Sequence, residues 1–189
     1  MTTMTMARSS LWAIDTRTIV YAAIGAALYG VLASASVVIP GTTAVSVRPA
    51  FALVPFFGFA FGPIVGFFTG LVGNMIGDQI SGWGALTSPH WSLANGLVGL
   101  IAGLSPMYLG RWIERGFSGR ALAAAVGGAI AVVIGFLAVF LGIVISAMDF
   151  NTILTTEYIP VIVVDIIATV IIVPALLYLW APAAERTGR

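Results

Sequence analysis

The sequence contains no cysteine and no lysine, and it is poor in charge of either sign. Without cysteine, disulfides, thiolate catalysis and cysteine-ligated metal sites are excluded. The basic residues are all arginine, which fits neither a polybasic nucleic-acid patch nor a basic tail, so we expect no nucleic-acid partner. Only 8% of the residues are charged, whereas about 25% is usual in soluble domains. The composition therefore excludes an ordinary soluble domain.

Several chemical motifs are also missing. No Gly-x-x-x-x-Gly-Lys-Ser/Thr loop is present, so any ATP must be bound by a partner. His90 is the only histidine and the carboxylates match no metal-binding spacing, so we expect no metal site. A serine hydrolase could use His90 with Ser88 or Ser92, but the Gly-x-Ser-x-Gly motif is absent. We therefore predict that the protein is not an enzyme and holds no covalent cofactor.

What the chain has in abundance is apolar sequence, at 60% of its 189 residues. At about 20 residues per spanning helix, this length accommodates about six spans with short connections. Apolar stretches cover residues 18–38, 50–77, 91–109, 121–147 and 158–180. We predict an all-α integral membrane protein with a cytoplasmic N-terminal tail at 1–17, a single membrane domain at 18–181 and a cytoplasmic C-terminal tail at 182–189.

The stretch 50–77 could form one long span or two short helices that turn at Gly62-Pro63, where two helix breakers meet. Arginines distinguish the two, because loops on the cytoplasmic side carry an excess of basic residues. With a hairpin there are six spans, and seven arginines lie on one side with Arg48 alone opposite. With a single helix there are five spans, and most arginines move outside. We therefore predict six transmembrane helices, both termini cytoplasmic, and a short helical hairpin turning at Gly62-Pro63.

Polar and aromatic residues gather at the outer ends of these predicted helices. Small-molecule sites generally pair apolar surfaces with a few hydrogen-bonding groups. Alternatively, the charges are solvated loop residues and the aromatics form an interfacial belt. Asp165 lies inside an apolar stretch, where it should face a cavity or pair with Arg48. The predicted substrate-binding residues are Arg48, Asn74, Asp78, Trp83, His90, Trp91, Asn95, Tyr158 and Asp165.

Small residues recur every fourth position in the first helix, at Ala22, Ala26 and Gly30. Such a stripe lets another helix approach closely. It could dock a partner protein, or it could pack against the protein's own helices.

A family resemblance rests on Phe61-Gly62-Pro63 and the glycine-rich sequence that follows it, Asp78, His90-Trp91-Ser92, and the segment 96–100. In their order and spacing these features resemble the substrate-binding S component of an energy-coupling factor (ECF) vitamin transporter, of the riboflavin type, over about residues 18–180. The resemblance implies a multi-pass protein of a prokaryotic cell membrane that binds a water-soluble vitamin from outside.

The resemblance also implies partners, namely a transmembrane coupling subunit (T component) and two ABC ATPases, with docking through Ala22, Ala26 and Gly30. A riboflavin-like ligand comes first, while a thiamine precursor, cobalamin or another vitamin stays open. The alternative function is an autonomous secondary transporter or channel. Asp165, Pro160 and Pro174 favour it, but no paired broken helices or internal repeat are visible.

Overall fold

The computed structural model describes residues 12–42 and 45–186, and this part of the chain is almost entirely helical. It confirms the all-α prediction, apart from one two-stranded ribbon. The elements are α2 (Thr16–Ala33), β1 (Val37–Val38), β2 (Ser46–Val47), η1 (Pro49–Ala52), α3 (Leu53–Phe61), α4 (Pro63–Ile80), α5 (Pro89–Tyr108), α6 (Gly110–Ile113), α7 (Phe117–Gly135), η2 (Phe136–Leu141), α8 (Gly142–Ile145), α9 (Phe150–Ile153), η3 (Leu154–Tyr158) and α10 (Ile159–Arg186).

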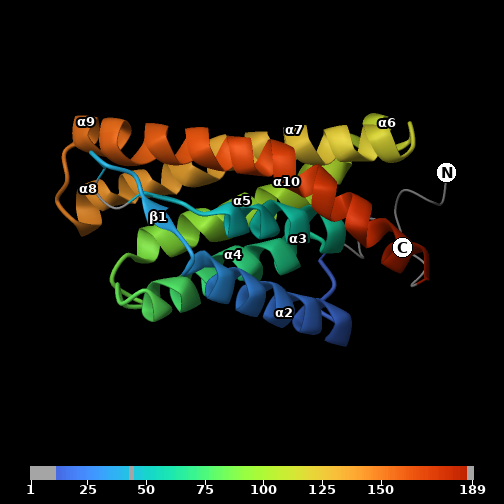
Figure 1. Cartoon of the computed structure of the whole chain (residues 1–189), viewed down its shortest axis with the longest axis horizontal. Coiled ribbons are helices and arrows are strands. Elements are labelled where there is room, and N and C mark those ends of the chain that lie inside the picture. Colours follow the sequence, from blue (N-terminus) through green and yellow to red (C-terminus); the bar gives the residue numbers. More distant parts are fainter. Residues whose placement is uncertain (1–11, 43–44, 187–189) are drawn as a thin grey trace.

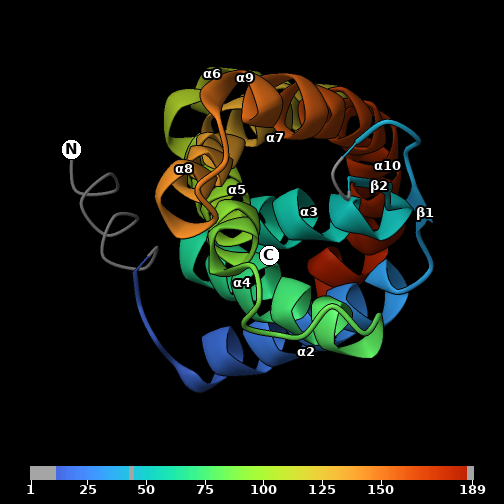
Figure 2. The ribbon, with the colours of Figure 1, turned by 90° about the vertical axis from the view of Figure 1, so that its left-hand side faces the viewer.

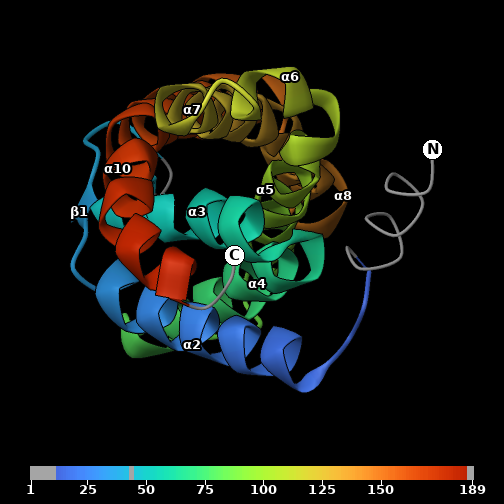
Figure 3. The same ribbon diagram turned by 90° about the vertical axis from the view of Figure 1, so that its right-hand side faces the viewer.

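The long helices form a bundle and run along its longest axis (Figure 1). α2 packs on α4, α4 packs on α3 and α5, and α5 and α10 both pack on α7. Seen from the end, α3 lies near the middle of the bundle, whereas α2, α7 and α10 lie on its outside (Figures 2 and 3). Three helical stretches are long and apolar enough to cross a membrane, namely Thr16–Ala33, Phe117–Ile145 and Phe150–Ala183.

The first helix ends earlier than the apolar pattern predicts. Asp15 caps α2 by accepting a hydrogen bond from the Thr18 backbone N–H at 2.8 Å. Beyond Ala33, the Ser34 hydroxyl donates to the Val31 carbonyl, and the chain then enters β1. β1 pairs antiparallel with β2, so the last residues of the expected helix 18–38 form a strand instead. β-branched residues such as Val37 favour a strand. At the end of an apolar run, however, the same residues can be interpreted as the last turn of a helix.

The predicted break at Gly62-Pro63 is confirmed. α3 ends at Phe61, and Gly62 has a φ of 107°, a left-handed conformation that favours glycine. Pro63 then occupies the first position of α4, where its missing N–H costs nothing. A Cβ atom on Gly66 would lie 2.6 Å from the Gly58 Cα, so the two helices double back on each other.

The last two helical stretches are longer than predicted. Helical structure is continuous from α7 through α8, and again from α9 to Arg186, so residues 182–186 of the expected C-terminal tail extend α10. Asp149 caps α9 through the backbone N–H groups of Asn151 and Thr152, and hydrogen bonds from Thr152 hold the Asp149 pKa below its usual range. Of the expected tails, residues 1–11 and 187–189 lie outside the described part of the chain.

A π-helical turn, η3, joins α9 to α10. Pro160 follows directly and has no N–H to donate to the preceding turn, which accounts for the irregular hydrogen bonding there. From η3 into α10, the inward face carries a row of buried residues at four-residue spacing, Glu157, Val161, Asp165 and Thr169. Polar side chains thus reach well inside the bundle.

Candidate functional site

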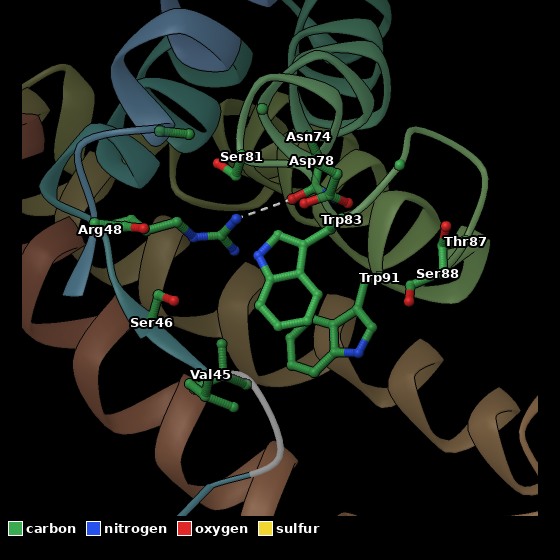
Figure 4. Close-up of a pocket in the computed structure, with 15 residues that line it drawn as sticks. Val45, Ser46, Arg48, Asn74, Asp78, Ser81, Trp83, Thr87, Ser88 and Trp91 are labelled. Atoms are coloured by element: carbon green, nitrogen blue, oxygen red, sulfur yellow. Dashed lines mark hydrogen bonds between the residues drawn. The ribbon is translucent and has the colours of Figure 1, made fainter. Parts of the chain in front are cut away.

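A cleft of about 110 Å³ opens at one end of the bundle. It lies between the end of α2, β2, the end of α4, the loop 81–88, the start of α5 and α10 (Figure 4). The lining residues are Ala33, Ser36, Val45, Ser46, Arg48, Asn74, Gly77, Asp78, Ser81, Trp83, Gly84, Thr87, Ser88, Trp91 and Val161. The cleft therefore brings together segments from most of the chain.

One wall of the cleft is a hydrogen-bonded polar chain centred on Asn74 (Figure 4). The Asn74 Oδ1 accepts from the Arg48 Nη1 at 3.0 Å. The Asn74 Nδ2 donates to the Asp78 Oδ2 at 2.8 Å and to the Ser92 Oγ at 3.2 Å. Asn74 is buried and uses both ends of its amide, so it holds the guanidinium and the carboxylate in fixed positions.

Two tryptophans form the opposite, aromatic side of the cleft. Trp83 projects from the loop 81–88, and its indole lies beside that of Trp91 at the start of α5 (Figure 4). Trp91 is supported from behind by Phe136, with ring centroids 5.9 Å apart. Trp83 is 58% exposed. One aromatic face is therefore fixed, and the other stands on an exposed loop.

Five of the nine predicted binding residues line this cleft: Arg48, Asn74, Asp78, Trp83 and Trp91. The remaining four do not, and each has another position in the fold. Asn95 accepts a hydrogen bond from the Tyr29 hydroxyl at 2.8 Å inside the bundle. Tyr158 donates to the Val133 carbonyl at 2.8 Å and packs against Phe140.

His90 is buried and faces α8, where its Nε2 lies 3.5 Å from the position that a Cβ on Gly142 would take. It is the residue next to Trp91, and neighbours along a helix point about 100° apart, so Trp91 faces the cleft while His90 faces α8. The cleft does not bring His90, Asn95 and Tyr158 together with the other predicted residues.

Asp165 is buried, at 1% exposure, and lies one helical turn beyond the cleft residue Val161. It interacts electrostatically with Arg48, as expected, but it forms no ion pair with it, and the Asp165 Oδ2 has no hydrogen-bond partner among the described residues. The Arg48 Nε is likewise buried and unpartnered in this part of the chain. Asp165 thus lies next to the site but outside the lining of the cleft.

The sequence did not identify the hydroxyl-bearing residues of the cleft. They lie in the α2–β1 connection, in β2 or in the loop 81–88, where serine and threonine carry no distinguishing pattern, and they are Ser36, Ser46, Ser81, Thr87 and Ser88. Tyr29 was also missed as the partner of Asn95. A tyrosine in the middle of an otherwise apolar helix was the available signal, because a buried hydroxyl needs a hydrogen-bond partner.

The small-residue stripe of α2 divides between two environments. Gly30 is buried against α4, where an added Cβ would lie 2.6 Å from Ile76, so its close packing is internal. Ala22 and Ala26 border an apolar groove between α2 and α4, together with residues that include Ile64 and Phe68. The predicted docking role is compatible with Ala22 and Ala26, whereas Gly30 packs inside the protein.

Comparison with known proteins identifies a family. A model of the family described as ECF-type riboflavin transporter, S component, matches residues 13–181. The chain is similar to the UPF0397 protein of Aliivibrio salmonicida (strain LFI1238), with 40% identity over 103 residues, which is 54% of this chain and 55% of the relative. It is also similar to the UPF0397 protein of Vibrio atlanticus (strain LGP32), with 38% identity over 100 residues, 53% of this chain and 54% of the relative.

The matched region spans about half the length of these curated relatives. No solved structure matches the chain. The family match, in contrast, covers nearly all of the described residues and includes every residue of the cleft. Because the family is a transporter component, the expectation that the protein is not an enzyme is confirmed. The chain belongs to the S component family of ECF-type riboflavin transporters.

Proposed function

We propose that this protein is the substrate-capture subunit of an ECF-type importer and that it binds a water-soluble vitamin in the cleft beside Asn74. The observation that carries this proposal is the meeting of a fixed polar wall, Arg48–Asn74–Asp78, with the indoles of Trp83 and Trp91. A planar ring can stack on an indole while its polar edge exchanges hydrogen bonds with the opposite wall. Riboflavin is the first vitamin to test, because the family description names it.

The size of the cleft implies that part of the protein moves when a whole vitamin binds. Pockets that enclose small ligands usually measure about 300–1,000 Å³, and this cleft measures about 110 Å³. It can receive one ring, and a whole vitamin requires the loop 81–88 to swing outward. Trp83 stands exposed on that loop, which makes the loop the natural entrance.

The proposal includes the predicted topology, with six spans and both termini cytoplasmic in a prokaryotic cell membrane. The cleft lies at the end of the bundle that carries the loop 81–88 and the α8–α9 connection, while α6, which contains Arg111, lies at the opposite end (Figure 1). The positive-inside rule then directs the cleft outward.

Delivery requires partners, since the chain has no nucleotide-binding loop. We propose docking on a T component that is driven by two ABC ATPases. The groove bordered by Ala22 and Ala26 supports this, because small side chains on an outer helix allow another helix to approach closely.

Binding is tested with the full chain purified in detergent. Bound flavin would colour the preparation yellow, and titration with riboflavin and other vitamins would quench tryptophan fluorescence. Trp91→Phe should weaken binding by about 1 kcal/mol, because phenylalanine keeps a ring but loses much of the stacking area. Trp12→Phe is the control, since Trp12 is exposed before α2 and away from the cleft. A colourless protein that responds to no vitamin in a broad panel would overturn the proposal.

A further inference from the structure

The charged side chains at the cleft are held apart from one another. Arg48 is the one cationic side chain among the residues that line it, and it interacts electrostatically with two carboxylates, Asp78 and Asp165. Asp78 lines the cleft directly, and Asp165 is buried one turn beyond Val161. Asp78 is therefore the one carboxylate among the lining residues that a ligand in the cleft can reach. Inside a membrane protein an uncompensated charge is costly and is usually paired or neutralised.

The hydrogen bonds show which carboxylate is available. Asn74 lies between Arg48 and Asp78 and forms a hydrogen bond with each of them. Within the described part of the chain, Arg48 and Asp78 form no direct ion pair with each other. The Asp78 Oδ2 accepts from Asn74, while no described group donates to its Oδ1. Asp78 is left as an acceptor that needs a positively charged or strongly donating partner.

The aromatic side of the cleft also favours a positively charged ligand. The faces of indole rings carry negative potential, and tryptophan is the best aromatic partner for a cation. Trp83 and Trp91 place two such rings beside the carboxylate of Asp78 (Figure 4). Two independent features, a carboxylate held apart from Arg48 and a pair of indoles, thus favour a positively charged or N–H-donating group in the same small volume.

We propose that the cleft selects a planar nitrogen heterocycle that carries a positive charge or an amino-substituted, amidine-like edge. Its ring stacks on Trp91 and is covered by Trp83, and its N–H groups donate to Asp78. A neutral ring such as that of a flavin satisfies the stacking but not the charge, and a carboxylate-bearing vitamin is repelled by Asp78. This inference rests on the proposed function and specifies the ligand class of the same site.

Three probes of different charge test the inference on the purified, unmodified protein: thiamine as a cation, riboflavin as a neutral planar ring, and biotin as an anion. Affinities come from tryptophan quenching and calorimetry. We expect thiamine to bind at least about tenfold more tightly than riboflavin and biotin not to bind, as a charge-assisted hydrogen bond to Asp78 would give. Raising the salt concentration should weaken thiamine binding alone.

Asp78→Asn keeps the shape and one acceptor but removes the charge. It should lower the thiamine affinity about tenfold or more and the riboflavin affinity by a smaller factor, because only the cation loses a charge-assisted hydrogen bond. Asp149→Asn is the matched control, because Asp149 is exposed and outside the cleft. If Asp78→Asn fails to fold, the ranking of the three probes on the unmodified protein still decides the question.

The outcomes separate the two proposals. Tight riboflavin binding with weaker thiamine binding would overturn the charge inference and leave the vitamin-capture function standing. Equal loss of both ligands in Asp78→Asn would also contradict it, since the carboxylate would then serve only to shape the cleft. Failure of every vitamin to bind would overturn the proposed function and the inference together.

Discussion

At the scale of single residues, Asn74 organises the site. Its amide lies between the Arg48 guanidinium and the Asp78 carboxylate and fixes the position of both. The amide oxygen accepts from Arg48, and the amide nitrogen donates to Asp78 and Ser92. A residue whose hydrogen bonds all go to neighbouring side chains has none left for a ligand. Asn74 is therefore a positioning residue, and the direct ligand contacts fall to Arg48, Asp78 and the tryptophans.

Asn74→Ala should both destabilise the protein and weaken ligand binding. The substitution leaves the Ser92 hydroxyl and one Arg48 donor without their buried partner, which costs about 1–3 kcal/mol. Thermal unfolding in detergent measures the first effect, and the vitamin titration measures the second. Asn151→Ala is the matched control, because Asn151 is exposed at the start of α9. An Asn74→Ala protein as stable and as active as the control would contradict this role.

The sequence predicted the polar wall better than the rest of the pocket. Arg48, Asn74 and Asp78 were recognisable because polar groups beside apolar spans need a reason to be there. His90 and Asn95 met the same criterion, yet one faces α8 and the other bonds Tyr29. Which way a side chain points depends on helix rotation, and the weak amphipathic pattern of these helices does not define that rotation.

At the scale of elements, strong local signals were reliable and weak ones were not. The turn at Gly62-Pro63 was predictable because two breakers coincide, and the π-helical turn before α10 was not, because it depends on how Pro160 is accommodated. The strands β1 and β2 were missed since a two-residue pairing leaves no periodic pattern. The early start of α9 was also missed, although Asp149 is a good N-cap residue.

The packing of α3, α4 and α5 depends on glycines that let backbones touch. A Cβ on Gly99 would collide with the carbonyl of Gly66 across the α4–α5 contact, and backbone atoms cannot move aside as a side chain can. Gly99→Ala should therefore lower the free energy of unfolding by about 1–3 kcal/mol or more, despite the better helix propensity of alanine.

Gly110→Ala provides the comparison for this prediction. Nothing lies within 4 Å of a Cβ at Gly110 in α6, so the same substitution there should leave stability unchanged or slightly raise it. Thermal unfolding and the yield of monodisperse protein measure both variants. If Gly99→Ala behaved like Gly110→Ala, the close α4–α5 contact would not stabilise the fold.

At the scale of the whole molecule, the helices that are both long and apolar enough to span a membrane lie on the outside of the bundle. The helices that meet the length and hydropathy requirement for spanning are α2, α7–α8 and α9–α10, which lie on the outside and expose residues such as Ile24, Leu137 and Ile171. α4 and α5 carry Asn74 and Asn95, which neighbouring helices cover. Inner helices can be less apolar because they meet protein instead of lipid, and hydropathy alone therefore undercounts the spans.

Topology is the prediction that decides the direction of transport. Since the chain has no cysteine, single cysteines can be introduced and labelled in intact cells with a membrane-impermeant maleimide. Ser146 and Ser118 form a matched pair, because both are exposed and lie at the two ends of the α7–α8 stretch. With six spans, Ser146→Cys should react from outside and Ser118→Cys only after permeabilisation. The reverse pattern would indicate five spans and place the cleft inside, where a subunit that captures an external vitamin could not use it.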